Sequence, residues 1–187
     1  MNSVRIIGGN WRRRVLRFPD SEGLRPTPDR VRETVFNWLG QDLSGQTCLD
    51  LFSGSGALGF EAASRGAAKV VMVDSSAKVV SALQANAKIL DPDGRLQIVR
   101  GDAVKFASSL RAGGSRFDVV FLDPPYKQGW IERLSPCLPD LLNDGGLLYV
   151  EAEFAITEGY GLTTLRSGRA GQVYYHLMRK GGADDAE

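Results

Sequence analysis

Short apolar runs alternate with amphipathic stretches along most of the chain. From residue 46 onward, the runs are typical of buried parallel strands, and the stretches between them place apolar residues at helical spacing. We expect strands at 47–52, 69–74, 96–100, 117–122 and 146–151. We expect helices in between, one ending at 65 and others over 77–90, 103–110 and 131–142. This alternation predicts an α/β fold with a doubly wound, mostly parallel sheet.

Both ends of this region follow a different pattern. Residues 4–7 and 15–18 are β-prone runs separated by glycines, so they predict a hairpin. A helix is expected over 29–39, capped by Thr27 or Asp29. Near the other end, 162–166 and 172–178 flank a glycine-containing turn at 168–171 and predict an antiparallel hairpin at the sheet edge.

Composition and charge narrow the class of protein. The chain has 187 residues, 43% of them apolar, and a net charge of +1, which suits one globular domain. The apolar runs are too short to cross a membrane and no apolar segment follows the first arginines, so we expect a cytoplasmic protein. Cys48 and Cys137 lack the spacing of metal ligands, so we expect buried thiols and no metal site. A monomer is expected.

Positive charge is concentrated at the beginning of the chain. The first 17 residues contain five arginines and no acid, whereas residues 183–187 are acidic. Such an asymmetry favours a polyanionic partner, although a solvated arginine surface would look the same in sequence. The candidate RNA-binding residues are Arg5, Arg12, Arg13, Arg14, Arg25 and Arg30.

A glycine-rich turn follows the first buried strand. Gly54, Gly56 and Gly59 come just after Asp50, which ends the alternating apolar strand. Glycines let the backbone turn tightly and approach a ligand. The acid would repel the pyrophosphate of a dinucleotide, but it would attract an ammonium or a sulfonium. The turn therefore predicts S-adenosyl-L-methionine as cofactor, with an ordinary strand-to-helix turn as the alternative.

Acids also follow the next two strands. Asp74 stands where an acid can accept hydrogen bonds from ribose hydroxyls, and Asp102 where an acid can bind the adenine amino group. Each could instead be a helix cap or a turn former. The predicted cofactor-binding set is Asp50, Phe52, Gly54, Gly56, Asp74, Asp102 and Ala103.

The fourth strand of this region leads into Asp123-Pro124-Pro125-Tyr126. The prolines stiffen the backbone, so the Asp123 carboxylate and the Pro124 carbonyl become fixed acceptors beside an aromatic ring. Two acceptors that hold the N–H bonds of a nucleobase amine let its nitrogen pyramidalise and act as a nucleophile. Tyr126 would hold the base by stacking. The predicted catalytic residues are Asp123, Pro124 and Tyr126, with a merely structural proline loop as the alternative.

These blocks, in this order, resemble the bacterial small-subunit ribosomal RNA guanine-N2 methyltransferase family. The resemblance extends over nearly the whole chain and rests on 5–9, 24–33, 50–59, 123–126 and 170–173. It implies a Rossmann-like class I methyltransferase with a mostly parallel seven-stranded sheet, an antiparallel C-terminal hairpin and an N-terminal hairpin and helix. It also implies direct methyl transfer to the N2 amine of a guanine in 16S rRNA, preferably once the 30S particle has assembled.

The expected organisation is a basic RNA-recognition extension over 1–45, a methyltransferase domain over 46–180 and a flexible acidic tail over 181–187. Two other functions would explain some of these sequence features. An adenine-N6 amino-methyltransferase acting on DNA or RNA would use the same Asp-Pro-Pro-Tyr chemistry. A non-catalytic RNA-binding protein would explain the arginines, but it would not explain acids at the ends of successive strands. The pattern assigns no role to Asn86 and only a structural one to His176.

Overall fold

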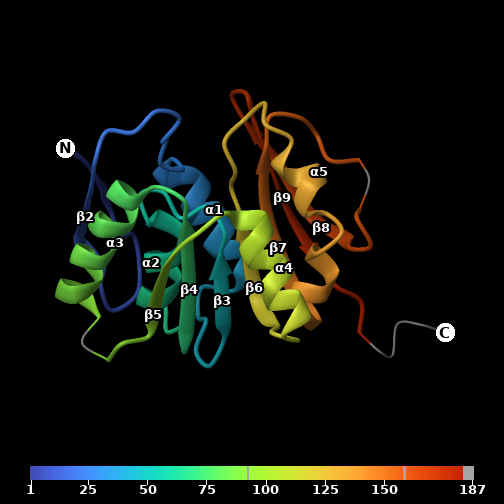
Figure 1. Cartoon of the computed structure of the whole chain (residues 1–187), viewed down its shortest axis with the longest axis horizontal. Helices are drawn as coiled ribbons and strands as arrows, with labels where there is room; N and C mark the ends of the chain where they lie inside the picture. Colours follow the sequence, from blue (N-terminus) through green and yellow to red (C-terminus); the bar gives the residue numbers. More distant parts are fainter. Residues whose placement is uncertain (92, 158, 183–187) are drawn as a thin grey trace.

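A sheet of seven strands in the order β5-β4-β3-β6-β7-β9-β8 forms the centre of the computed structural model, which describes residues 1–91, 93–157 and 159–182 (Figure 1). Strands β3 to β7 run parallel, and β9 and β8 continue the sheet antiparallel. The strands are β3 Thr47–Asp50, β4 Lys69–Asp74, β5 Leu96–Arg100, β6 Phe117–Leu122, β7 Leu142–Ala152, β8 Thr163–Ala170 and β9 Val173–Arg179. The predicted fold class is confirmed.

Helices cover both faces of this sheet. One apolar cluster packs α1 (Asp29–Leu39), α2 (Ala57–Ser64) and α3 (Ala77–Leu90) on one face. A second cluster packs α4 (Ala103–Ala112), α5 (Trp130–Leu134) and the 3₁₀ helix η1 (Leu138–Leu141) on the other. The N-terminal hairpin, β1 (Asn2–Arg5) and β2 (Val15–Phe18), contributes to the first cluster, so the extension shares its core with the sheet.

One hydrogen bond and one close backbone approach hold the hairpin against the helices. The side-chain amide of Asn86 on α3 donates to the carbonyl of Arg17 at 2.9 Å and thereby supports β2, which gives Asn86 the role that its sequence context did not reveal. At the hairpin tip, Gly9 has φ +74° and packs against the end of α2, where a Cβ would lie 1.9 Å from the carbonyl oxygen of Ser64. The close approach therefore requires glycine at this position.

A buried ion pair joins the N-terminal extension to the main sheet. Glu61 on α2 accepts the backbone N–H of Ile7 at 2.9 Å and that of Gly8 at 2.8 Å. The Arg32 guanidinium on α1 lies 3.5 Å from the Glu61 carboxylate and donates to the carbonyls of Arg5 and Thr27. The side chains of Arg32 and Glu61 are 0% exposed. Polar positions of a surface helix are ordinarily solvated, and for Arg32 this expectation is wrong.

The predicted helix over 131–142 is also wrong. Helix α5 ends at Leu134, η1 covers Leu138–Leu141, and β7 begins at Leu142. Pro136 and Pro139 lie inside the predicted segment. Because proline has no N–H and disfavours helical backbone in the residue before it, two prolines three positions apart prevent one continuous helix.

Smaller differences concern ends and caps. Strand β8 continues through Gly168 to Ala170, so the turn lies at 171–172, later than the predicted 168–171. Pro28 occupies the N-cap of α1 without a side-chain cap bond, so neither Thr27 nor Asp29 caps this helix. Within the acidic tail predicted at 181–187, residues 183–187 lie outside the described residues.

We predict that Arg32→Met lowers the free energy of unfolding by about 3–5 kcal/mol, because it removes one of the two cations that compensate the buried Glu61 carboxylate and leaves the Arg5 and Thr27 carbonyls without their side-chain donor. Arg30→Met, on the exposed side of the same helix, should change it by less than about 0.5 kcal/mol. Urea denaturation followed by circular dichroism measures both. Equal stabilities for the two variants would contradict a buried ionic anchor.

Candidate active site

The strand order reverses between β3 and β6, which lie side by side at the centre of the sheet. From β3 the chain proceeds outward through β4 and β5, and from β6 it proceeds the other way through β7. Ligands of such sheets bind beyond the carboxyl ends of the strands at this reversal. Asp50 ends β3, and Asp123 directly follows β6. The fold therefore brings together the two acids to which the sequence analysis gave most weight.

Asp50 is a buried carboxylate without a hydrogen bond of good geometry. It is 1% exposed, and neither of its carboxylate oxygens has a partner at such geometry among the described residues. Burial, together with the charge of Asp74, raises the pKa of Asp50 to about 7, and the nearby Gly59 and Phe52 N–H groups and the Ser53 hydroxyl only partly oppose this rise. A buried carboxylate is costly unless a cation or donors compensate it. This orphaned group fits a cationic ligand such as the ammonium of an amino acid.

The glycine turn is held by Asp74. The Gly54 N–H donates to one carboxylate oxygen of Asp74 at 3.0 Å, and the Ser76 N–H donates to the other at 2.9 Å. Asp74 therefore fixes the turn, and its remaining lone pairs are available to a ligand hydroxyl. Gly56 is required by packing, because it has φ +84° and a Cβ there would lie 2.6 Å from the Phe60 ring. Its presence is no independent sign of a ligand.

The other predicted cofactor residues lie at the ends of β3 and β5. Asp102 is the N-cap of α4 and accepts the Lys105 N–H at 2.9 Å, which is the capping alternative considered for it. Ala103 is buried at the start of the same helix. Phe52 is partly buried and meets Trp130 edge to face, with ring centroids 5.3 Å apart. Trp130 was missed by the sequence analysis, since no local motif marks it.

The predicted catalytic loop follows β6. Pro124 is buried, whereas Tyr126 is 37% exposed and can present its ring to a ligand. Burial is the largest cause that raises the pKa of Tyr126 to about 12, followed by the charges of Asp123 and Glu151, while Arg25 opposes the rise. The tyrosine is therefore a neutral ring at physiological pH. Burial, and next the charge of Glu151, raises the pKa of Asp123 well above its usual range.

Three further polar residues surround Asp123, and the sequence analysis missed all of them. Leu122 pairs with Val150, so Asp123 and Glu151 come next on neighbouring strands. The Thr27 hydroxyl lies 3.2 Å from a carboxylate oxygen of Asp123 and 3.1 Å from one of Glu151. The Tyr149 hydroxyl donates to the same Glu151 oxygen at 2.6 Å. Glu151 carries a signal that could have found it, an acid at the end of a buried strand.

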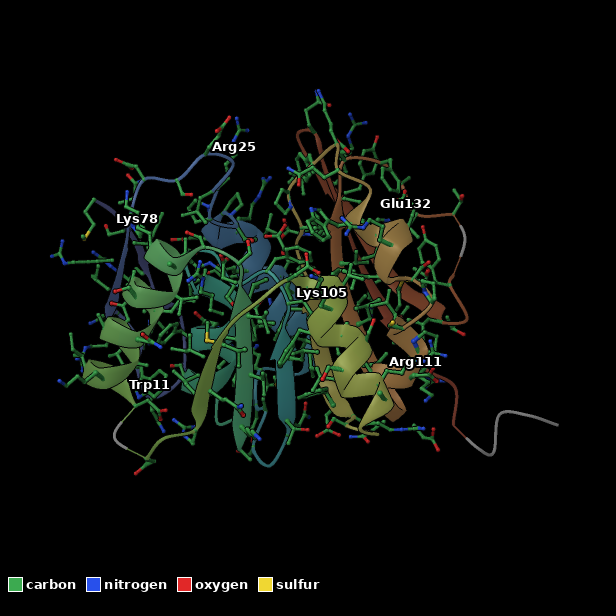
Figure 2. All side chains as sticks on the ribbon, in the orientation of Figure 1. Trp11, Arg25, Lys78, Lys105, Arg111 and Glu132 are labelled. Carbon is green, nitrogen blue, oxygen red and sulfur yellow. The ribbon has the colours of Figure 1, made fainter. Side chains whose placement is uncertain are left out.

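The candidate RNA-binding arginines are all exposed, but they divide between two places. Figure 2 shows Arg25 at the upper edge, the edge at which the loop after β6 lies in Figure 1, and Trp11 at the lower edge. Arg12, Arg13 and Arg14 follow Trp11, whose N–H donates to the Ser64 hydroxyl at the end of α2. Because α2 has 8 residues, its two ends are about 12 Å apart. The hairpin tip is thus remote from the acids.

Arg5 and Arg30 lie nearer the connector between β2 and α1. Arg5 borders a groove of about 390 Å³ that is also lined by residues 26–29. Arg30 is in the first turn of α1. The structure therefore places Arg5, Arg25 and Arg30 around one segment and the three tip arginines around another.

Two absences concern the part of the chain that the structure describes. No group of three or more His, Cys, Asp or Glu side chains there is arranged to hold a metal ion. None of its helices combines the length and apolar character needed to cross a membrane.

His176, which was expected to be structural, is buried and accepts the Ile156 N–H at its Nε2.

Comparison with known proteins places these features in a family. The family model described as "Conserved hypothetical protein 95" matches residues 4–179. The Ribosomal RNA small subunit methyltransferase D of Escherichia coli is 42% identical over 98% of this chain and 94% of its own length. The solved structure of Escherichia coli yhhF has a TM-score of 0.86 and 40% identity, covering 97% of this chain and 99% of that one. The crystal structure of SMU.776 complexed with SAH, at 19% identity and a TM-score of 0.61, shares the fold.

The sheet order and the acids at its reversal define a class I methyltransferase fold. Within that class, the chain belongs to the ribosomal RNA small subunit methyltransferase D family. The family named from the sequence motifs is thereby confirmed.

We predict that Asp50→Ala abolishes measurable binding of S-adenosyl-L-methionine, because charge-assisted hydrogen bonds of this kind contribute about 1.5–3 kcal/mol each. In the parent protein, the cofactor ammonium binds the ionised form of the Asp50 carboxylate. The affinity for the cofactor should therefore fall as the pH drops below about 7, the pKa of Asp50, and approach a tenfold loss per pH unit. Isothermal titration calorimetry across this pH range measures both effects. Unchanged affinity in the variant would remove Asp50 from the cofactor site.

Proposed function

We propose that this protein transfers a methyl group from S-adenosyl-L-methionine to the exocyclic N2 amine of a guanine in small-subunit ribosomal RNA, within the assembled 30S particle. The observation that carries this proposal is the pair of acids at the sheet reversal, of which Asp50 is buried and Asp123 is half-buried. Asp50 on β3 is orphaned and suits a cationic donor, while Asp123 after β6 is an acceptor beside an exposed aromatic ring.

The cofactor is S-adenosyl-L-methionine, as the sequence predicts. When bound, it supplies a methyl group already activated by its sulfonium. Asp50 would hold the ammonium of its methionine portion, since no described residue gives that buried carboxylate a hydrogen bond of good geometry. Asp74 would accept the ribose hydroxyls with the lone pairs left by Gly54 and Ser76, and Asp102 would accept the adenine amine with the oxygen left free by its cap bond. Phe52, Gly54, Gly56 and Ala103 would complete the pocket.

The residues after β6 would prepare the amine. The Asp123 carboxylate and the Pro124 carbonyl accept its two N–H bonds, which frees the nitrogen lone pair from the ring and turns it outward. Tyr126 stacks on the base and keeps it in register with these acceptors. The N–CH3 bond would form as the S–CH3 bond breaks, the thioether product would leave, and the surplus N2 proton would pass to the Asp123 carboxylate. Alignment of donor and amine is the main catalytic contribution and can supply roughly 7–11 kcal/mol.

We expect tritium from labelled S-adenosyl-L-methionine to appear in small subunits, with little in naked ribosomal RNA and none in DNA.

Asp123→Ala should retain cofactor affinity and slow single-turnover transfer by at least about 100-fold, because its contacts are made to the base in the transition state. Asp93→Ala, an exposed acid in the loop before β5, is the control and should keep transfer. Transfer to DNA alone, or near-normal turnover of the Asp123 variant, would contradict the proposal.

The proposed RNA contacts are the phosphates near Arg5, Arg12, Arg13, Arg14, Arg25 and Arg30. All six side chains are exposed. Arg25 lies close enough to Tyr126 to lower the pKa of its hydroxyl, so it would hold RNA beside the target base. The tip arginines lie about one α2 length away and would hold a neighbouring part of a folded RNA.

Replacing Arg12, Arg13 and Arg14 together by Gln should reduce the salt slope of RNA binding by roughly 0.7–0.9 for each phosphate that is no longer neutralised, because every arginine bound to a phosphate releases counterions. Cofactor affinity should not change. Arg25→Gln should flatten the slope less, since it removes a single arginine, but it should also slow transfer from bound RNA. Binding titrations at several salt concentrations measure the slopes. A parental slope in the triple variant would shift RNA recognition to Arg5, Arg25 and Arg30.

A further inference from the structure

Thr27 occupies an unusual position for a residue of the N-terminal extension. It lies in the connector between β2 and α1, yet it is 5% exposed and its hydroxyl reaches Asp123 on the catalytic loop, 96 positions along the chain. The helix that follows begins with Pro28 at its N-cap, so the Thr27 hydroxyl is not used as a cap. Its side chain is directed at the two acids instead.

The network around Asp123 has fewer protons than acceptors. Thr27 has one hydroxyl proton and lies 3.2 Å from Asp123 and 3.1 Å from Glu151, so it can donate to only one of them at a time. Glu151 also accepts the Tyr149 hydroxyl at 2.6 Å. The Thr27 proton is thus available to Asp123, where it would fix one carboxylate oxygen and leave the other for a ligand.

Thr27 is itself held from behind. The Arg32 guanidinium donates to the Thr27 carbonyl at 3.3 Å and lies 3.5 Å from the Glu61 carboxylate on α2. A continuous line of contacts therefore joins the buried ion pair of the extension to the catalytic loop. Because Arg32 is fully buried, the Thr27 backbone has little freedom to turn its side chain elsewhere.

We propose that Thr27 and Glu151 are positioning residues for methyl transfer: Thr27 orients the Asp123 carboxylate toward the amine, and Glu151 controls its charge. This inference rests on the proposed function. Neither residue needs to touch the substrate, since both act through Asp123.

The charges that face Asp123 set the expected pH behaviour. Glu151 on β7 and Asp50 on β3 are the acids beside it, Thr27 comes from the connector, and Tyr126 lies on its own loop. After burial, the charge of Glu151 is the largest cause that raises the pKa of Asp123. Removing that charge should lower this pKa, so Asp123 would remain ionised at more acidic pH.

Thr27→Val keeps the shape of the side chain and removes the hydroxyl. Transfer at saturating cofactor and RNA should slow about tenfold or more, as expected when a hydrogen bond to a charged group is removed, while cofactor affinity and KM for the subunit stay at parental values. Thr27→Ser restores the hydroxyl and should restore most of the rate. Thr34→Val on α1 is the matched control, since its hydroxyl donates to the Arg30 carbonyl of its own helix.

A Thr27→Val rate equal to that of the Thr34 control would overturn the assignment. A Thr27→Ser variant as slow as Thr27→Val would overturn it too, because the slower rate would then come from packing and not from the hydroxyl.

Glu151→Gln tests the second half of the proposal without an activity assay. Carboxyl carbon NMR of labelled protein should show the Asp123 titration at lower pH in Glu151→Gln than in the parent, while Glu33→Gln on the exposed side of α1 should leave it in place. An unmoved Asp123 titration would refute the role of Glu151. The two proposals can fail separately. If the parent protein transfers no methyl group, the proposed function is contradicted. The Asp123 titration still tests whether Glu151 controls the charge of Asp123, because it does not depend on activity.

Discussion

Glu61 is the buried group on which the placement of the N-terminal extension depends. Its carboxylate accepts two backbone N–H groups of the residues that follow β1, and it pairs with Arg32 at 3.5 Å and Arg65 at 2.9 Å. A lone carboxylate in this position would be strongly destabilising, whereas one with these donors is compensated. Since Arg32 also bonds to the carbonyls of Arg5 and Thr27, a single acid on α2 fixes the hairpin and the connector together.

The acids at the carboxyl ends of the strands, unlike Glu61, are not fully compensated by donors. Asp50 has no hydrogen bond of good geometry among the described residues, and Asp123 and Glu151 share one threonine hydroxyl. These acids are under-compensated in the protein alone, so their charge is directed toward what binds there. A cationic cofactor beside Asp50 and an amine beside Asp123 would each supply the missing partner. Glu61 has the donors and cations that a buried carboxylate needs, and this stabilises the fold. The acids at the sheet edge lack part of that set, and a bound ligand would supply it.

Much of the fold could be predicted from local sequence. Strands over 69–74, 96–100 and 117–122 were predicted at their observed bounds because they are short, mostly apolar runs. Asp50 and Asp123 could be found because each follows such a run within a short motif.

What could not be predicted depends on contacts between distant segments. Nothing local distinguishes Arg32, which is buried, from Arg30, which is exposed on the same helix. Thr27 appeared to be a helix cap until the fold placed its hydroxyl beside Asp123. Helix α5 is shorter than predicted because Pro136 and Pro139 outweigh the apolar spacing around them. Tertiary packing decides the first two cases, and proline chemistry decides the third.

The chemical identity of the methylated atom tests the proposed role of the acids most directly. Small subunits from cells that lack this protein would be treated with the purified protein and S-adenosyl-L-methionine, and their RNA digested to nucleosides for mass spectrometry. We predict one new species, N2-methylguanosine, mapped to a single position in the small-subunit RNA. Appearance of N6-methyladenosine instead, or of no methylated nucleoside while the protein binds its cofactor normally, would contradict the proposed role of the acids at the sheet edge.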